Sequence, residues 1–279
     1  ASGDGSAVAR RLAWGERLRR ALDSGRLRLV AQPLVALEPA LPTRVELVVR
    51  VVGDDGELVP PAAFMPAAER FGLAGELDRW AIRAAVAELA TRRRRGEHTT
   101  LELTLSASAV SDPELPAFVE RELRAKGTDG RGLALLVPEA AAIATTDRAR
   151  LLAKRLIELG VEAGLSEFGA GFGSFRALEH LPFGYVKIDR ELVAGLAQSR
   201  TRQLVVRAIA DLARALGRRC AAAGADEEAA AMLRAWGVDY VQPLAPFASG
   251  RATLAGPDYA LGNAGAAGDD LRARSTELF

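Results

Sequence analysis

Glu46-Leu47-Val48-Val49-Arg50 places one acid and one base inside an aliphatic run that extends from Val45 to Val52. Valine and leucine at this density favour a β-strand, so we predict a strand that carries Glu46 and Arg50 among apolar neighbours. Seven further runs share this strand-like character, at residues 27–35, 100–105, 133–137, 161–165, 185–188, 219–222 and 238–242. The eight runs alternate with helical patterns, which predicts an α/β barrel with functional residues at the carboxyl ends of its strands.

The helical patterns have the 3.6-residue periodicity of amphipathic helices. They cover residues 10–23, 61–71, 75–90, 112–125, 147–159, 204–216 and 227–236. Gly160, Gly217 and Gly237 directly follow the last three of them. Glycine just past a helix adopts the left-handed conformation that ends the helix, so these positions mark helix boundaries.

The length of 279 residues would suit one large domain or two ordinary ones. Barrels of this type commonly reach this size as one unit, so we predict a single barrel over residues 21–248. Residues 1–20 are predicted to be a lead-in helix or linker, and the Gly- and Ala-rich residues 249–279 a weakly structured tail. The chain opens with Ala1 and not with methionine, which is the pattern expected of a fragment of a longer protein.

Composition argues against several classes of protein. The net charge of +1 gives no general argument for binding nucleic acid or membranes. The run from Arg92 to Arg95 has no interleaved aromatic residues and is expected to be a solvated helix end rather than a nucleic-acid patch. Cys220 is the only cysteine, no apolar run has the length of a membrane span, and no signal peptide is visible. We therefore expect a cytoplasmic protein without a membrane segment.

Several short motifs, in their order and spacing, resemble those of the EAL domain family, bacterial phosphodiesterases that hydrolyse cyclic di-GMP. They are Gln32-Pro33-Leu34-Val35, Glu46-Leu47-Val48-Val49-Arg50, Phe64-Met65-Pro66-Ala67-Ala68-Glu69 with Gly72-Leu73, Glu167-Phe168-Gly169-Ala170-Gly171-Phe172, Leu181-Pro182 with Val186-Lys187-Ile188-Asp189, and Asp239-Tyr240-Val241-Gln242. The resemblance covers residues 21–247 and implies a modified (β/α)8 TIM-like barrel with one antiparallel strand. In active members two metal ions at the barrel mouth activate a water that attacks a phosphodiester bond.

The resemblance also implies metal ligands at the strand ends, and most of them are missing. Glu46 stands at the signature acid, and Lys187 at the lysine that helps to orient the attacking water. Where the family has Asn, Glu, a pair of Asp and a further Glu, this chain has Thr104, Leu136, Ser166 with Glu167, and Ala223. Two remaining carboxylates, Glu46 and Glu167, cannot hold two metal ions. We therefore expect the Mg²⁺ site and catalysis to be lost, with Glu46, Glu167 and Lys187 as remnants.

Ligand binding requires fewer groups than hydrolysis. Gln32 and Arg50 match family positions that contact the phosphates of cyclic di-GMP, and the fork of an arginine suits phosphate oxygens. Glu46, Lys187 and Gln242 complete the set of ligand-binding candidates. The resemblance thus allows a receptor for cyclic di-GMP.

Other features argue against binding or have structural explanations. Ala223 removes an acid that receptors of this kind often use for a guanine edge, and Pro243 replaces a glycine and one backbone donor. Glu46 is explained more simply as a core ion-pair partner, for which Lys187 is the candidate, and Arg50 could equally close an ion pair at the barrel rim.

Glu139 and the loop that contains Gly169 and Gly171 are interpreted as structural. In the family the acid at Glu139 braces this loop, and the loop lies near the dimer interface, so its presence suggests a homodimer. The two glycines could also be simple turn residues.

Three functions remain open. The chain could be a regulatory module that acts through contact with a partner protein, a receptor whose state follows cyclic di-GMP, or an active phosphodiesterase with rearranged metal ligands. The missing acids argue strongly against the third. We interpret the chain as a catalytically inactive EAL domain that acts as a receptor, a protein-interaction module, or both.

Overall fold

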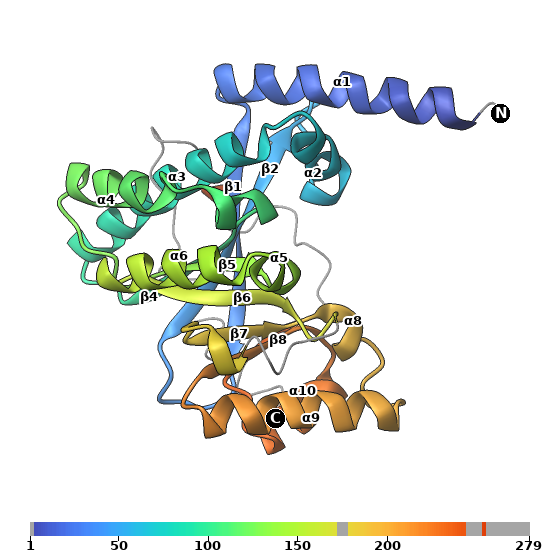
Figure 1. Cartoon of the computed structure of the whole chain (residues 1–279), viewed down its shortest axis with the longest axis vertical. Helices are drawn as coiled ribbons and strands as arrows, with labels where there is room; N and C mark the ends of the chain where they lie inside the picture. Colours follow the sequence, from blue (N-terminus) through green and yellow to red (C-terminus); the bar gives the residue numbers. More distant parts are fainter. Residues whose placement is uncertain (1–2, 172–177, 244–252, 255–279) are drawn as a thin grey trace.

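The structure, a computed structural model, describes residues 3–171, 178–243 and 253–254, with side chains for residues 13–171 and 178–243. Strands and helices alternate along most of the chain (Figure 1). In chain order the elements are α1 (Gly3–Asp23), β1 (Leu27–Ala36), β2 (Thr43–Val52), β3 (Leu58–Val59), α2 (Pro61–Arg70), α3 (Ala74–Arg94), β4 (Thr99–Thr104), the 3₁₀ helix η1 (Ala107–Ser111), α4 (Leu115–Ala125), β5 (Leu133–Pro138), α5 (Glu139–Ala144), α6 (Thr146–Glu158), β6 (Glu162–Phe168), β7 (Tyr185–Ile188), α8 (Arg190–Val193), α9 (Arg200–Ala215), β8 (Arg219–Ala225), α10 (Glu227–Ala235), β9 (Tyr240–Pro243) and β10 (Thr253–Leu254).

Eight of these strands close into a barrel in the order β1-β9-β8-β7-β6-β5-β4-β2, and β2 returns to β1. Neighbouring strands are parallel except at β1, which is antiparallel to both β2 and β9. The two short strands β3 and β10 extend the sheet beside β2 and β1. The predicted α/β barrel with one antiparallel strand is confirmed.

The core lies between the barrel wall and its outer helices. Residues 133–137 of β5 are all buried, as expected of a parallel strand that is covered on both faces. Ile82, Val86 and Leu89 of α3 pack against the barrel in one continuous cluster, which confirms the helical spacing seen in the sequence. Gly160, Gly217 and Gly237 have φ angles of 78°, 67° and 75°, so they end their helices in the left-handed conformation.

Helix α1 lies across α2 at one end of the molecule, and its amino-terminal part projects beyond the rest (Figure 1). Leu18 and Ala21 are buried against Phe64 of α2, and the rings of Trp14 and Phe64 are 6.1 Å apart. The helix predicted over residues 10–23 is therefore present and ends at Asp23 as predicted, but it begins earlier, at Gly3. Its last turn packs into a cluster with Phe64 that is separate from the main core.

Two local expectations differ from the structure. The helix predicted from Asp112 begins at Leu115, since Asp112 accepts a hydrogen bond from the Glu114 amide and forms a turn instead. Arg92 is buried and paired with Glu88 at 2.6 Å, so the arginine run is not wholly a solvated helix end.

The tail predicted over residues 249–279 lies outside the described residues except for 253–254, which pair with β1 and are therefore part of the sheet. Within the part of the chain that the structure describes, no helix is long and apolar enough to cross a membrane.

Candidate functional site at the barrel mouth

Glu46 is the centre of a group of polar side chains at the barrel mouth. Its Oε2 atom accepts hydrogen bonds from Gln242 Nε2 at 2.6 Å and forms an ion pair with Lys187 Nζ at 2.9 Å. Its Oε1 atom lies 3.4 Å from the Thr104 hydroxyl, and Gln242 Nε2 also donates to Gln32 Oε1 at 3.0 Å. The fold thus brings together four of the predicted ligand-binding residues, and the predicted ion pair between Glu46 and Lys187 is present.

Strand register explains this convergence. Glu46 of β2 lies opposite Gln32 of the antiparallel β1 and beside Glu102 of the parallel β4. Gln242 of β9 and Lys187 of β7 come from strands further round the barrel. Residues from five strands meet because a closed barrel directs alternate side chains of every strand to its interior.

Two charged residues that sequence reasoning missed lie deeper in the barrel. Glu102 is fully buried, and its Oε1 atom is 3.0 Å from Lys187 Nζ. Its Oε2 atom is 3.0 Å from Arg44 NH1, and Arg44 also pairs with Glu162. The guanidinium of Arg44 is 4.1 Å from the ring centroid of Tyr185, and it is also fully buried.

These contacts form an alternating chain of charges, here called the barrel ion chain, which comprises Glu46, Lys187, Glu102, Arg44 and Glu162. Burial alone would raise the pKa of Glu102, but the charges of Lys187 and Arg44 hold it below its usual value. Burial alone would lower the pKa of Lys187, but Glu102 and Glu46 raise it above its usual value. Glu102 and Lys187 are therefore both stabilised in their ionised forms, and each satisfies a charge that would be costly to bury alone.

Arg50 lies four residues beyond Glu46 along β2, so both side chains are on the same face of the strand. Its side chain is only 3% exposed, and its NH1 atom donates to the Val49 carbonyl at 3.2 Å. Burial lowers the pKa of Arg50, although Glu46 partly opposes this effect. An arginine held in this way is oriented before any ligand arrives.

The other side of the mouth offers few donors or acceptors. Leu136 is fully buried, and Ala223 has no polar atom. Ser166 is buried, and its hydroxyl has no hydrogen-bond partner among the described residues. Among all the residues that the structure describes, no three His, Cys, Asp or Glu side chains are arranged to hold a metal ion. Since both oxygens of Glu46 face protein donors, the residues present do not fit a two-metal centre.

The loop after β6 is built as the sequence suggested, although Glu167 is separate from Glu46. Glu139 Oε2 accepts a hydrogen bond from the Gly169 amide at 3.0 Å, which is the predicted bracing contact. Gly169 has a φ of 93°, and a Cβ there would lie 2.6 Å from Leu192, so only glycine fits. Gly171 has open space around its Cα, so nothing in the described residues requires glycine there.

Glu167 itself is exposed and has a φ of 54°, the only positive value among the described residues other than glycine. Burial of its inner part and the nearby charges of Asp189 and Glu69 raise its pKa. Its charged neighbours are therefore acids, and among the described residues it forms no hydrogen bond or ion pair with the barrel ion chain. The remnant carboxylates predicted from the sequence do not form one cluster.

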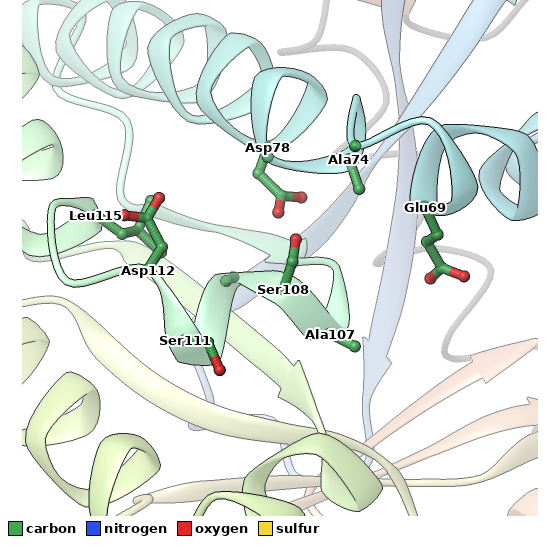
Figure 2. A pocket seen from close by; sticks show the side chains of 11 residues that line it. Glu69, Ala74, Asp78, Ala107, Ser108, Ser111, Asp112 and Leu115 are labelled. Carbon is green, nitrogen blue, oxygen red and sulfur yellow. The ribbon is translucent and has the colours of Figure 1, made fainter. Parts of the chain in front are cut away.

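A separate cavity of about 550 Å³ lies between the amino-terminal end of α3 and η1 (Figure 2). Asp78, Ser108 and Asp112 are among its lining residues, and the side chains of Asp78 and Ser108 point toward one another. Asp78 accepts hydrogen bonds from the Ser106 amide at 3.0 Å and from the Ser106 hydroxyl at 2.6 Å. Burial raises the pKa of Asp78 to about 6. None of the candidate residues predicted from the sequence lines this cavity.

A closed eight-stranded barrel with one reversed strand, and with polar side chains gathered inside one end, defines a class of modified α/β barrels. The family model described as EAL domain matches residues 15–242. The chain belongs to the EAL domain family.

Comparison with known proteins gives relatives of more than one kind. The chain is 32% identical over 218 residues to the uncharacterized protein Rv1354c of Mycobacterium tuberculosis, covering 77% of this chain and 35% of that protein. It is 28% identical over 231 residues to the cyclic di-GMP phosphodiesterase PdeB of Shewanella oneidensis, covering 82% of this chain and 27% of that protein. The chain thus spans about a third of the length of these relatives.

Among solved structures, the chain is similar to the FimX EAL domain of Xanthomonas citri in complex with cyclic di-GMP, with a TM-score of 0.78 and 30% identity. The match covers 92% of this chain and 99% of that domain. The relatives therefore include both a phosphodiesterase and an EAL domain with cyclic di-GMP bound.

Proposed function

We propose that this chain is a non-catalytic EAL domain that acts as a metal-independent receptor for cyclic di-GMP. The observation that carries the proposal is the state of Glu46, whose two oxygens both accept from protein donors. A carboxylate that binds a catalytic metal must direct an oxygen at that metal, and this one is already satisfied by Lys187 and Gln242. With Leu136 and Ala223 in place of acids, the mouth lacks the oxygen ligands that two-metal hydrolysis needs.

Binding is supported by the groups that remain at the mouth. Arg50 is buried and oriented, and its guanidinium can pair with two oxygens of one phosphate. Gln32 and Gln242 present amide groups beside Glu46 that can donate to or accept from a nucleotide. The two phosphates of cyclic di-GMP are anionic, so these contacts require no bridging metal. The bound cyclic di-GMP of the similar FimX domain supports the same ligand for this chain.

Calorimetric titration of cyclic di-GMP into the protein, in EDTA and again in Mg²⁺, tests the receptor proposal. We expect saturable binding that is equal in both buffers. Arg50→Ala should weaken it at least about tenfold, because it removes a charge-assisted contact to phosphate. Arg155→Ala is the matched control, since Arg155 is an exposed arginine on the outer helix α6 that pairs with Glu158. A flat titration would reject the receptor and leave a protein-interaction module.

An assay for the linear dinucleotide tests the absence of catalysis. We expect no product with Mg²⁺ or Mn²⁺ present. Metal-dependent turnover that Glu46→Gln abolishes would instead establish the alternative, an active phosphodiesterase with rearranged ligands.

We further propose that the output of the domain passes through protein contact, including a homodimer. Leu204 of α9 and Leu216, the residue directly after this helix, are 55% and 46% exposed. A Cβ at Gly169 would lie 2.9 Å from Ile209, so the loop after β6 packs against the buried face of α9. Sedimentation should show a dimer that Leu204→Glu disrupts, whereas Leu151→Glu on α6 should leave it intact. Monomeric wild-type protein would reject the homodimer.

A further inference from the structure

Ser166 carries a buried hydroxyl for which the described part of the protein provides no partner. The residue is 3% exposed, and its Oγ atom forms no hydrogen bond among the described residues. Ser106 is also buried, but its hydroxyl donates to Asp78 at 2.6 Å. A buried polar group without a partner costs stability, so each such group in a folded protein requires an explanation.

The alternation of side chains along β6 directs this hydroxyl into the barrel. Ala163 and Leu165 belong to the core between the barrel wall and the outer helices. A Cβ at Gly164 would lie 3.0 Å from Leu136, which belongs to the separate cluster inside the barrel. Successive side chains of a strand point to opposite faces. Ser166, two residues after Gly164, therefore faces the interior near the carboxyl end of its strand.

A β-bulge beside Ser166 keeps its side chain on this face. The pairing of β6 with β7 shifts register between Leu165 and Phe168, so two residues of β6 face only Lys187 of β7. The extra residue is Glu167, which has the left-handed φ of 54°. Without it, Phe168 would share the face of Ser166; with it, Phe168 returns to the outer core. The unfavourable backbone of Glu167 thus allows Ser166 to stay inside the barrel.

Ser166 and Gln32 lie on opposite walls of the mouth. In the closed order of the eight strands, β6 is four places from β1 in either direction. Arg50 lies on β2, which pairs with β1 beside Gln32. Cyclic di-GMP has two phosphates on opposite sides of one ring, and both are anions that accept hydrogen bonds. A ligand that directs one phosphate to Arg50 therefore has a second phosphate available for the opposite wall.

We propose that Ser166 is a ligand-binding residue of the mouth, whose hydroxyl donates a hydrogen bond to the second phosphate of cyclic di-GMP. A hydroxyl can meet a phosphate oxygen directly, whereas a carboxylate beside a phosphate needs a cation between the two anions. Ser166 thus supports binding without metal on the side of the mouth where Leu136 and Ala223 carry no polar group. This inference rests on the proposed receptor function and adds a second point of contact to it.

Two measurements on Ser166→Ala test this role: calorimetric titration of cyclic di-GMP in EDTA, and the melting temperature of the protein without nucleotide. We expect the affinity to fall at least about fivefold, because one hydrogen bond to an anion is lost. The variant without nucleotide should melt about 2–4 °C above wild type, because it no longer buries an unpaired hydroxyl. A hydroxyl that only supports the fold would lower the melting temperature when removed.

Ser106→Ala is the matched control, because Ser106 is equally buried but its hydroxyl is bonded to Asp78. This control should melt below wild type and bind cyclic di-GMP with wild-type affinity. Ser166→Thr and Ser166→Val form a second pair of nearly equal shape, of which only threonine has a hydroxyl. The threonine variant should bind at least about fivefold more tightly than the valine variant, and this pair carries the test if Ser166→Ala fails to fold.

The proposal is overturned if Ser166→Ala binds with wild-type affinity, if the threonine and valine variants bind equally, or if Ser166→Ala without nucleotide melts below wild type. Each of these results leaves the receptor intact, since the wild-type titration and its weakening in Arg50→Ala do not depend on Ser166. A flat titration of the wild-type protein rejects the receptor and the Ser166 contact together. Failure of the contact alone is therefore distinguishable from failure of the receptor.

Discussion

Two buried carboxylates in different regions of this molecule have opposite charge behaviour. Glu102, inside the barrel, contacts the cations Lys187 and Arg44, and its pKa lies below its usual value. Asp78, in the outer layer between α3 and η1, contacts the amide and hydroxyl of Ser106, and burial raises its pKa to about 6. Burial opposes ionisation in both regions. The comparison shows that a touching cation overcomes that cost, whereas neutral donors reduce it without removing it.

Glu88 of α3 is intermediate between these two cases. It pairs with Arg92 at 2.6 Å, yet burial still raises its pKa above its usual value. One touching cation therefore does not bring the pKa of Glu88 below its usual value, whereas the two cations in the barrel do so for Glu102.

Removing a cation from the barrel should have the largest effect on the stability of the protein. Arg44→Met leaves the fully buried Glu102 with one cationic partner. We expect the free energy of unfolding, measured in urea, to fall by about 3–5 kcal/mol. Arg44→Met combined with Glu102→Leu should recover most of that loss, because Lys187 keeps Glu46 as its partner and only the partly exposed Glu162 loses its ion pair. Equal stability of the single and double variants would mean that Glu102 does not depend on Arg44.

Asp78 should make stability depend on pH in the opposite sense to a paired acid. Its folded pKa of about 6 exceeds the unfolded value of 3.8, so the folded state binds the proton more tightly. The stability that this proton provides is present below about pH 4 and is lost as the pH rises through 6, amounting to roughly 3 kcal/mol at most. Urea unfolding from pH 4 to pH 8 should show this slope in the wild type.

Asp78→Asn is the matched variant, because it keeps the shape of the side chain and cannot ionise. Its stability relative to wild type should increase from pH 4 to pH 8. If the stability of the two proteins changes with pH in the same way, the pKa of Asp78 is the same in the folded and the unfolded protein.

Ser106→Ala sharpens the comparison by removing one neutral donor from Asp78. The hydroxyl lies 2.6 Å from the carboxylate, and its loss should cost about 2 kcal/mol at neutral pH. It should also move the Asp78 transition to higher pH, because the ionised form loses a donor. Ser108→Ala is the control, since the Ser108 hydroxyl contacts Ser106 and not Asp78. If the Asp78 transition stays at the same pH in Ser106→Ala, the Ser106 hydroxyl does not influence the ionisation of Asp78.

The smallest expected effect concerns Glu167, an exposed acid whose charged neighbours are also acids. Its φ of 54° is unfavourable for any residue with a Cβ, so Glu167→Gly should stabilise the protein by about 1 kcal/mol. Glu167→Gln removes the charge and keeps the Cβ, which separates backbone strain from repulsion by Asp189 and Glu69. Destabilisation by glycine would show that the Glu167 side chain makes a contact that holds the loop.

The elements of the fold could be predicted because their signals are local. Apolar runs marked the eight barrel strands, and glycines such as Gly160 marked helix ends. The short elements β3, β10, α5 and α8 were missed, since two to six residues carry too little periodicity to be recognised. The turn at Asp112 was missed because its side chain competes with the helix for the local backbone.

The candidate site was predicted only where a motif named a residue. Glu46, Lys187 and Gln242 were found in this way, and the structure brings them together. Arg44 and Glu102 were not found, although each is a charged residue within an apolar strand. Their relation depends on the pairing of β2 with β4, which sets Glu46 beside Glu102 across 56 positions of the chain. Strand register of this kind cannot be read from a single sequence.

The pairing of Arg44 with Glu102 constrains how this domain can change over generations. Losing Arg44 leaves the buried Glu102 with Lys187 as its one cation, and losing Glu102 leaves Arg44 with Glu162 and Lys187 with Glu46, so each single substitution weakens the barrel ion chain. The two positions are epistatic, and descendants of this sequence should retain both or exchange both together.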